Sequence, residues 1–293
     1  MLRAGRNLPV VADAGEDAHA GDARRHLPSV ERVLADLDPT VPHSVRARIA
    51  RAVIAEARAG RLDPDAVGAA AAQRAADFRT GLLGPVLNAT GVLLHTNLGR
   101  APIGSDAVEA MVAATGYANI EYRLAEGVRG SRHEHAGALL AEACGAEAGI
   151  VVNNNAAAVL LVLAALARGR SVLVSRGELV EIGGGFRVPD ILAETGARLI
   201  EVGTTNRTRV ADYERALDPE VALVLKVHAS NYRMVGFTAA AAVPELAPLG
   251  PPVVVDAGSG LMDETTPWLG GPPEWLRDEP GVRQCITAGA ALV

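Results

Sequence analysis

The sequence contains few aromatic residues and a single lysine. Phe, Trp and Tyr together make up 3% of its 293 residues, so bases of a nucleic acid would find few rings on which to stack. Lys226 is the only lysine, and Cys144 and Cys285 are the only cysteines. The two cysteines are isolated and lack metal-ligand spacing, so we expect buried, reduced thiols in a cytoplasmic protein and no metal site.

Long apolar runs are absent as well. The longest, 156–167, is too short to span a membrane and fits a buried helix. The first 25 residues mix Arg, Asp, Glu and Gly without an apolar centre, which excludes a secretory signal in this stretch. We therefore expect residues 1–26 to form a flexible tail on a protein that does not bind membranes.

The net charge of −6 is unevenly distributed. Residues 1–80 hold 12 arginines against 11 acidic residues, whereas residues 81–293 hold 16 basic against 23 acidic ones. An acidic body disfavours non-specific binding to nucleic acid, so any contact with RNA would be local.

The pattern from 27 to 79 is helical and rich in alanine. Pro42 precedes a run with apolar residues at helical spacing, and a second helix is predicted over 65–79. Three arginines occupy a different face of the first helix: Arg48, Arg51 and Arg58. Gly81 and the Gly84-Pro85 pair indicate a domain boundary, which separates a helical unit, 27–80, from a larger domain, 81–293.

The larger domain alternates short β-branched runs with alanine-rich helices. Strands are predicted over 149–152, 171–174, 199–202, 222–227 and 252–256, and helices over 105–115, 136–144, 156–167, 182–195 and 212–217. This alternation predicts an α/β fold, a mostly parallel sheet with flanking helices. Ligands of such sheets bind at the carboxyl ends of the strands, where the polar motifs of this sequence fall.

One motif joins an apolar strand to a helix through three amides, Asn153, Asn154 and Asn155, followed by Ala156. A helix N-terminus offers free backbone N–H groups and the positive end of a dipole, which suits a phosphate. A simple asparagine cap would explain one of these residues, but three in succession favour a binding role.

A second motif places Asp256 at the end of an apolar strand, before Ala257-Gly258-Ser259-Gly260. A carboxylate there is costly without a partner, and the pyridinium nitrogen of pyridoxal phosphate is a suitable one. Ser259 could then bond the ring hydroxyl. Taken alone, an aspartate that begins a glycine-rich turn is the simpler interpretation.

Further polar residues are candidates for an anionic substrate. Arg100 ends the loop that contains His95 and Asn97, and its planar fork suits a carboxylate or phosphate. A lone surface arginine is the plain alternative. Histidines 133 and 135 flank a glutamate but lack further matching ligands, so a solvated helix start is favoured over a metal site.

Taken together and in this order, these motifs resemble bacterial selenocysteine synthases, the L-seryl-tRNA(Sec) selenium transferases. The resemblance begins at Leu27 and is most specific over 94–100, 152–158, 175–184, 201–207 and 226–237. The segment 264–280 fits the family pattern poorly.

The resemblance implies a fold-type-I enzyme that uses pyridoxal 5'-phosphate. It would convert seryl-tRNA(Sec) to selenocysteinyl-tRNA(Sec) with selenophosphate, through a dehydroalanyl intermediate, in the cytoplasm. Arg100 would bind the substrate or selenophosphate anion, the helical unit would bind tRNA through Arg48, Arg51 and Arg58, and subunits would form a homo-oligomer, a ring of dimers. Glu178, in the segment expected over the cofactor, is a candidate cofactor contact, and Lys226 and Asn231 are candidate substrate contacts.

The family carries its Schiff-base lysine after the pyridinium-binding aspartate, in a Ser-Gly-Asp-Lys motif. Lys226 precedes Asp256, so it is not expected to hold the cofactor, and a strand-end lysine is the plain alternative. We therefore expect a C-terminally truncated member of the family without that lysine. Two alternatives stay open: a related pyridoxal-phosphate lyase acting on a phosphorylated small amine, and a non-catalytic tRNA-binding or assembly protein.

Overall fold

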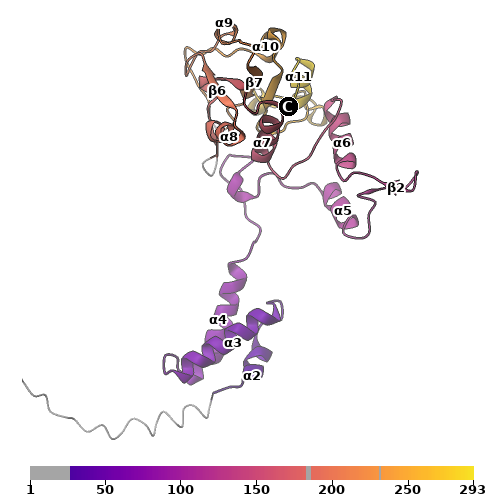
Figure 1. Cartoon of the computed structure of the whole chain (residues 1–293). Coiled ribbons are helices and arrows are strands. Elements are labelled where there is room, and N and C mark those ends of the chain that lie inside the picture. Colours follow the sequence, from indigo (N-terminus) through magenta and orange to yellow (C-terminus); the bar gives the residue numbers. More distant parts are fainter. Residues whose placement is uncertain (1–26, 183–185, 231) are drawn as a thin grey trace, which may run out of the picture. The chain divides into compact units, whose positions relative to one another are not determined.

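The computed structural model describes residues 27–182, 186–230 and 232–293. The chain divides between Gly91 and Val92 into two compact units, which are considered separately (Figure 1). Within the described residues, no helix is both long and apolar enough to cross a membrane.

The first unit is a small helical bundle. Its elements are α2 (Val30–Asp36), α3 (His43–Arg58), the 3-10 turn η2 (Pro64–Ala66) and α4 (Val67–Thr80). The Ser29 hydroxyl caps α2 by accepting from the Arg32 N–H. Val53 and Ala71 are completely buried between the helices. The apolar residues at helical spacing thus form a stripe on each helix, and these stripes pack together into one small core.

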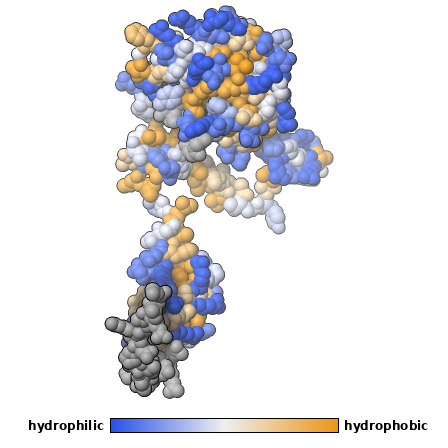
Figure 2. All heavy atoms as spheres, turned by 60° about the vertical axis from the view of Figure 1, so that its left-hand side comes forward, coloured by the Kyte–Doolittle hydropathy of each residue, from blue (hydrophilic) through white to orange (hydrophobic). Residues whose placement is uncertain are grey.

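The second unit begins with short elements before its sheet. These are η3 (Thr96–Leu98), α5 (Ser105–Ala113), the hairpin β1 (Tyr122–Arg123) and β2 (Val128–Arg129), α6 (Glu134–Cys144) and α7 (Asn155–Leu166). Their apolar side chains are largely exposed, including Met111, Leu139 and Leu161. The space-filling view shows apolar side chains on the surface among the polar ones (Figure 2).

A four-stranded parallel sheet forms the centre of the second unit, in the order β6-β3-β7-β8. Its strands are β3 (Ser171–Ser175), β6 (Arg198–Val202), β7 (Val221–Val227) and β8 (Val253–Asp256). β3 and β8 are fully buried, as continuous β-branched runs predict for a sheet covered on both faces. Leu292 adds a further parallel bridge to β8 through Val254.

Helices cover both faces of this sheet (Figure 1). The first face packs against α7 and α8 (Val188–Thr195) through Leu163 and Leu192. The second packs against α9 (Val210–Glu214), α10 (Val243–Leu246) and α11 (Val282–Thr287) through Tyr213, Leu246 and Cys285. The predicted α/β architecture with a parallel sheet and flanking helices is confirmed.

The remaining elements are short. They are η4 (Arg176–Glu178), the hairpin β4 (Glu181–Ile182) and β5 (Phe186–Arg187), η5 (Ala247–Leu249), η6 (Pro267–Leu269) and η7 (Glu274–Leu276).

Two predicted elements differ most from the structure, and the helix predicted over 212–217 is shifted to Val210–Glu214. The predicted strand 149–152 is not a strand, because no neighbouring strand pairs with it among the described residues, and Ile150 and Val151 stay exposed. The helix predicted over 182–195 begins only at Val188, because Ile182 belongs to the β4–β5 hairpin. Pro189 then stands in the first turn of α8, where the missing N–H costs nothing.

Candidate active site

Asp256 lies at the carboxyl end of β8 and is 9% exposed. Its Oδ1 accepts a hydrogen bond from Asn155 Nδ2 at 2.9 Å and one from the Gly258 N–H at 3.3 Å. No described residue donates to Oδ2. The sheet therefore presents a carboxylate that is fixed on one oxygen and has a free acceptor on the other.

The helix that supplies Asn155 begins beside this carboxylate. Asn154 caps α7, since its Oδ1 accepts from the Ala157 N–H at 2.8 Å, and its carbonyl accepts from the Ala158 N–H. No described group accepts from the backbone N–H of Asn155 or Ala156. These are the free donors that a helix N-terminus leaves for an anion.

Thus the structure brings together two of the predicted motifs. The amides after 152 and the carboxylate of Asp256 are far apart in sequence, yet Asn155 and Asp256 are in direct contact. Predicted Ser259 lies in the turn that follows, with its Oγ accepting from the Leu261 N–H at 3.3 Å.

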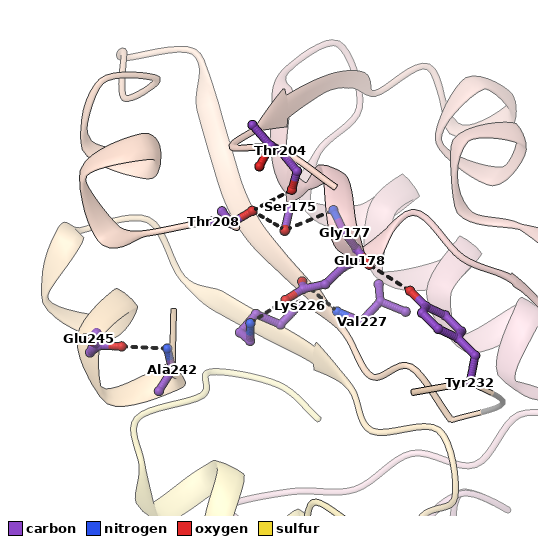
Figure 3. Close-up of polar contacts among 10 residues, drawn as sticks. All are labelled: Ser175, Gly177, Glu178, Thr204, Thr208, Lys226, Val227, Tyr232, Ala242 and Glu245. Carbon is purple, nitrogen blue, oxygen red and sulfur yellow. Dashed lines mark hydrogen bonds and ion pairs between the residues drawn. The ribbon is translucent and has the colours of Figure 1, made fainter. Parts of the chain in front are cut away.

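The second pair of predicted residues, Glu178 and Lys226, also meet each other. Lys226 Nζ lies 2.6 Å from Glu178 Oε1, and Glu178 Oε2 accepts from the Val227 N–H at 3.2 Å (Figure 3). Tyr213 and Cys285 flank this pair on the second face of the sheet. Burial, reinforced by the Glu178 charge, raises the pKa of the Tyr213 hydroxyl, and burial raises the pKa of the Cys285 thiol.

The loop with His95, Asn97 and Arg100 lies elsewhere in the second unit. His95 Nδ1 accepts from the Asn97 N–H at 3.2 Å, and the Arg100 N–H donates to the His95 carbonyl at 3.0 Å. Arg100 is exposed and has a φ of 61°, which is uncommon for a residue with a side chain. Among the described residues no hydrogen bond or ion pair links these three residues to Asp256 or Lys226. Asn231 lies outside the described residues.

The candidate tRNA-binding arginines lie on α3 of the helical unit. Arg48, Arg51 and Arg58 are all exposed and follow helical spacing on one face. None of them pairs with a carboxylate of the described chain, whereas Arg74 and Arg79 pair with Glu56 and Asp38. The three guanidinium groups are thus available to an anionic partner.

Sequence reasoning missed two residues at the carboxyl edge of the sheet. His228 follows β7 directly, and its ring Nε2 lies 3.3 Å from Glu279 Oε2. The backbone N–H of His228 donates to the backbone carbonyl of Asp256. The signal for His228 was available, because it is a polar residue at a strand end, like Asp256. Glu279 gave no signal, because its contact joins segments far apart in sequence. No group of three or more potential ligands could hold a metal ion in the described part of the chain.

Fold and site together define an α/β protein of parallel-sheet type, with free N–H donors at a helix N-terminus and a carboxylate at the carboxyl edge of the sheet. The sequence model of the family described as SelA, L-seryl-tRNA selenium transferase, matches residues 86–293. The chain belongs to this family.

Curated relatives agree with this assignment. The chain is 48% identical over 276 residues to the L-seryl-tRNA(Sec) selenium transferase of Geobacter sulfurreducens, covering 90% of this chain and 58% of that protein. It is 43% identical over 298 residues to that of Nitratidesulfovibrio vulgaris, covering 92% of this chain and 61% of the relative. The chain thus spans about three fifths of the length of these relatives.

Solved structures are more distant. D-glucosaminate-6-phosphate ammonia-lyase matches with a TM-score of 0.48 and 19% identity, over 67% of this chain and 50% of the lyase. The cystathionine γ-lyase CalE6 of Micromonospora echinospora matches with a TM-score of 0.38 and 18% identity, over 60% of this chain and 42% of that one.

Proposed function

We propose that this chain is part of a selenium transferase that converts seryl-tRNA(Sec) to selenocysteinyl-tRNA(Sec) with pyridoxal 5'-phosphate and selenophosphate. Its membership of the family over 86–293 carries this proposal. The contact between Asn155 and Asp256 supports it, because this contact joins the two motifs that a bound cofactor would need.

The described residues fit pyridoxal phosphate. Oδ2 of Asp256 is free to accept from a protonated ring nitrogen, and Asn155 holds the carboxylate through Oδ1. The free N–H groups at the start of α7, at Asn155 and Ala156, would hold the phosphate, with Asn154 securing the cap. Ser259 would contact the ring hydroxyl. The oxygens of Glu178 are held by Lys226 and the Val227 N–H, so Glu178 would border the site through its turn η4 and not through its carboxylate.

When bound, pyridoxal phosphate withdraws electrons from the α-carbon of the attached amino acid. Asp256 keeps the ring nitrogen protonated and so strengthens this withdrawal. Arg100, with His95, Asn97 and Asn231, would bind the anionic groups of the substrate or selenophosphate through charge-assisted hydrogen bonds. Lys226 is engaged by Glu178 and lies on the sheet face opposite to Asp256, so the Schiff-base lysine is to be sought elsewhere in the whole protein.

The helical unit, residues 27–80, would bind tRNA through Arg48, Arg51 and Arg58. Phosphates dominate the affinity of such contacts, and the exposed, unpaired guanidinium groups on one helix face suit them. We further propose a homo-oligomer, a ring of dimers as the family resemblance implies, which exposed apolar side chains such as Leu139 support.

Binding of seryl-tRNA(Sec) to the full chain tests this function. Replacing Arg48, Arg51 and Arg58 by alanine is expected to weaken binding and to reduce the slope of log affinity against log salt by about 2 to 3. Arg32→Ala, at an exposed position of α2, is the matched control and should bind like the wild type.

The outcome separates the three candidate functions. Binding of pyridoxal phosphate without tRNA binding, together with turnover of a phosphorylated small amine, would replace the proposed function by that of a lyase. Binding of tRNA without binding of pyridoxal phosphate would identify a non-catalytic tRNA-binding protein.

A further inference from the structure

The only lysine of the chain lies in a nearly buried ion pair. The side chains of Lys226 and Glu178 are 15% and 14% exposed, and their charged atoms are 2.6 Å apart. Glu178 also accepts from the Val227 N–H, so both of its oxygens are engaged (Figure 3). The pairing between β3 and β7 ends at Leu225. The Glu178 carboxylate thus binds the backbone of β7 two residues beyond that point, at Val227.

Strand alternation places this pair and Asp256 on opposite faces of the sheet. Val224, two residues before Lys226, packs against the helices of the second face, and so does Val255, next to Asp256. Asp256 itself points to the first face, where it meets Asn155 of α7. Lys226 therefore does not share the environment of the Asp256 carboxylate.

The turn that carries Glu178 is also held at Gly177. The Tyr232 hydroxyl donates to the Gly177 carbonyl at 2.8 Å, and the Gly177 N–H donates to Ser175 Oγ at 3.3 Å. Ser175 Oγ in turn lies 2.7 Å from Thr208 Oγ1. Side chains from several segments thus fix η4 at the carboxyl edge, and Lys226 holds its last residue by charge.

We propose that Lys226 is a positioning residue: its ammonium group holds Glu178 and thereby seats the turn Arg176–Glu178 against the end of β7, beside the proposed cofactor site. We call the Lys226–Glu178 ion pair the clamp, and its purpose at the cofactor site rests on the proposed function. Removing one partner of a nearly buried pair leaves the other charge without compensation, so the turn should loosen when the ammonium is lost.

Amide hydrogen exchange and pyridoxal phosphate binding of the full chain test this role. Lys226→Met should speed exchange at Val227 and in residues 176–179 by about tenfold or more. It should also weaken pyridoxal phosphate binding by about tenfold, because the loosened turn must be ordered again when the cofactor binds. Lys226→Arg, which keeps the charge, should restore most of both. Exchange in the interior of α7 should not change, which separates local loosening from global destabilisation.

Arg170→Met is the matched control. Arg170 donates to the Val221 carbonyl at 2.8 Å, at the amino end of the same strand, β7. Its loss should change neither exchange at Val227 nor binding of pyridoxal phosphate.

Amine labelling of the wild type tests the clamp without relying on the folding of a variant. As the only lysine, Lys226 should be acetylated much more slowly in the native chain than in the urea-unfolded chain. Equal labelling rates, or borohydride trapping of pyridoxal phosphate on Lys226, would overturn the clamp.

The clamp and the proposed function fail in different ways. If Asp256→Asn loses pyridoxal phosphate binding but Lys226→Met keeps it in full, only the proposed role of the clamp at the cofactor site is contradicted. A wild-type chain without affinity for pyridoxal phosphate would contradict the proposed function, and exchange at Val227 would still decide whether the clamp exists.

Discussion

At the scale of single residues, Asp256 is a nearly buried carboxylate with only one of its oxygens held by the described residues. Burial of an unpartnered charge costs free energy, and here Asn155 and Gly258 compensate one oxygen. The other oxygen receives no donor from the described residues. This oxygen is not one of the fully buried side-chain atoms without a partner in the described chain, so it is open to water or to a ligand such as the proposed cofactor.

Asn155→Ala should weaken pyridoxal phosphate binding by about threefold to tenfold, because one net hydrogen bond that orients the carboxylate is lost. Titration of the cofactor's absorbance measures the change. Asn153→Ala is the control, since no described group is hydrogen-bonded to the Asn153 side chain; equal losses in both variants would contradict the role of Asn155.

Asp38 provides a pH-dependent contact in the helical unit. A hydrogen bond from the Thr40 hydroxyl, then one from the Thr40 N–H, then one from Arg79, lower the pKa of the Asp38 carboxyl to about 2. A pKa lowered on folding means that the contact stabilises above the unfolded value near 4 and loses its effect as pH falls from about 4 to about 2.

Thr40→Val should therefore raise the pKa of Asp38 toward its usual value. An NMR titration of the Asp38 carboxyl carbon in the full chain measures it. Thr80→Val, at the end of α4, removes a hydroxyl that bonds only the Asp77 carbonyl and should leave that pKa in place; an unchanged pKa in Thr40→Val would refute the stated cause.

At the scale of elements, continuous β-branched runs identified the three buried strands β3, β7 and β8, because buried parallel strands need apolar side chains on both faces. The same signal failed at 149–152, where the run is apolar but pairs with no strand of the described residues. An apolar run shows that a segment is suited to a buried strand. Whether it forms one depends on a second strand, from a distant part of the sequence, that lies beside it. Likewise Asn155 and Asp256 were each found from local patterns, but the pairing of Glu178 with Lys226 was not, since no local pattern relates 178 to 226.

The turn η4 depends on a close backbone approach at Gly177. A Cβ added there would lie 2.5 Å from the Thr205 carbonyl oxygen, so Gly177→Ala should displace the turn and destabilise the chain by about 1 to 3 kcal/mol. Urea unfolding measures the loss. Gly68→Ala, in α4, is the control: the added Cβ meets no atom within 4 Å, and alanine favours a helix, so this variant should be slightly more stable than the wild type. Gly169→Ala would be unsuitable because Gly169 has a positive φ. Wild-type stability of Gly177→Ala would contradict the close packing of this turn.

At the scale of the whole molecule, the second unit exposes many large apolar side chains outside its sheet core. Leu160 and Leu161 on α7 are each 43% exposed, although this helix is apolar on all sides. A helix of this composition is usually covered, so we expect a partner surface.

The proposed homo-oligomer can be measured by light scattering. We expect a mass that is a multiple of the 30.2 kDa chain, and we expect Leu160→Glu with Leu161→Glu to reduce it. Glu109→Gln, on the exposed surface of α5, serves as the control for a surface change without added charge in an apolar patch. A wild-type mass of 30.2 kDa at every concentration would contradict assembly of this chain.

In the proposed function, Asp256 holds a protonated pyridinium at the carboxyl edge of the sheet. Nitrogen NMR of pyridoxal phosphate labelled at its ring nitrogen, bound to the full chain at a pH where the free ring is neutral, tests this most directly. We expect a protonated ring nitrogen in the wild type and in Asp218→Asn, and loss of that signal in Asp256→Asn. A neutral ring nitrogen in the bound wild type, or a protonated one in Asp256→Asn, would contradict it.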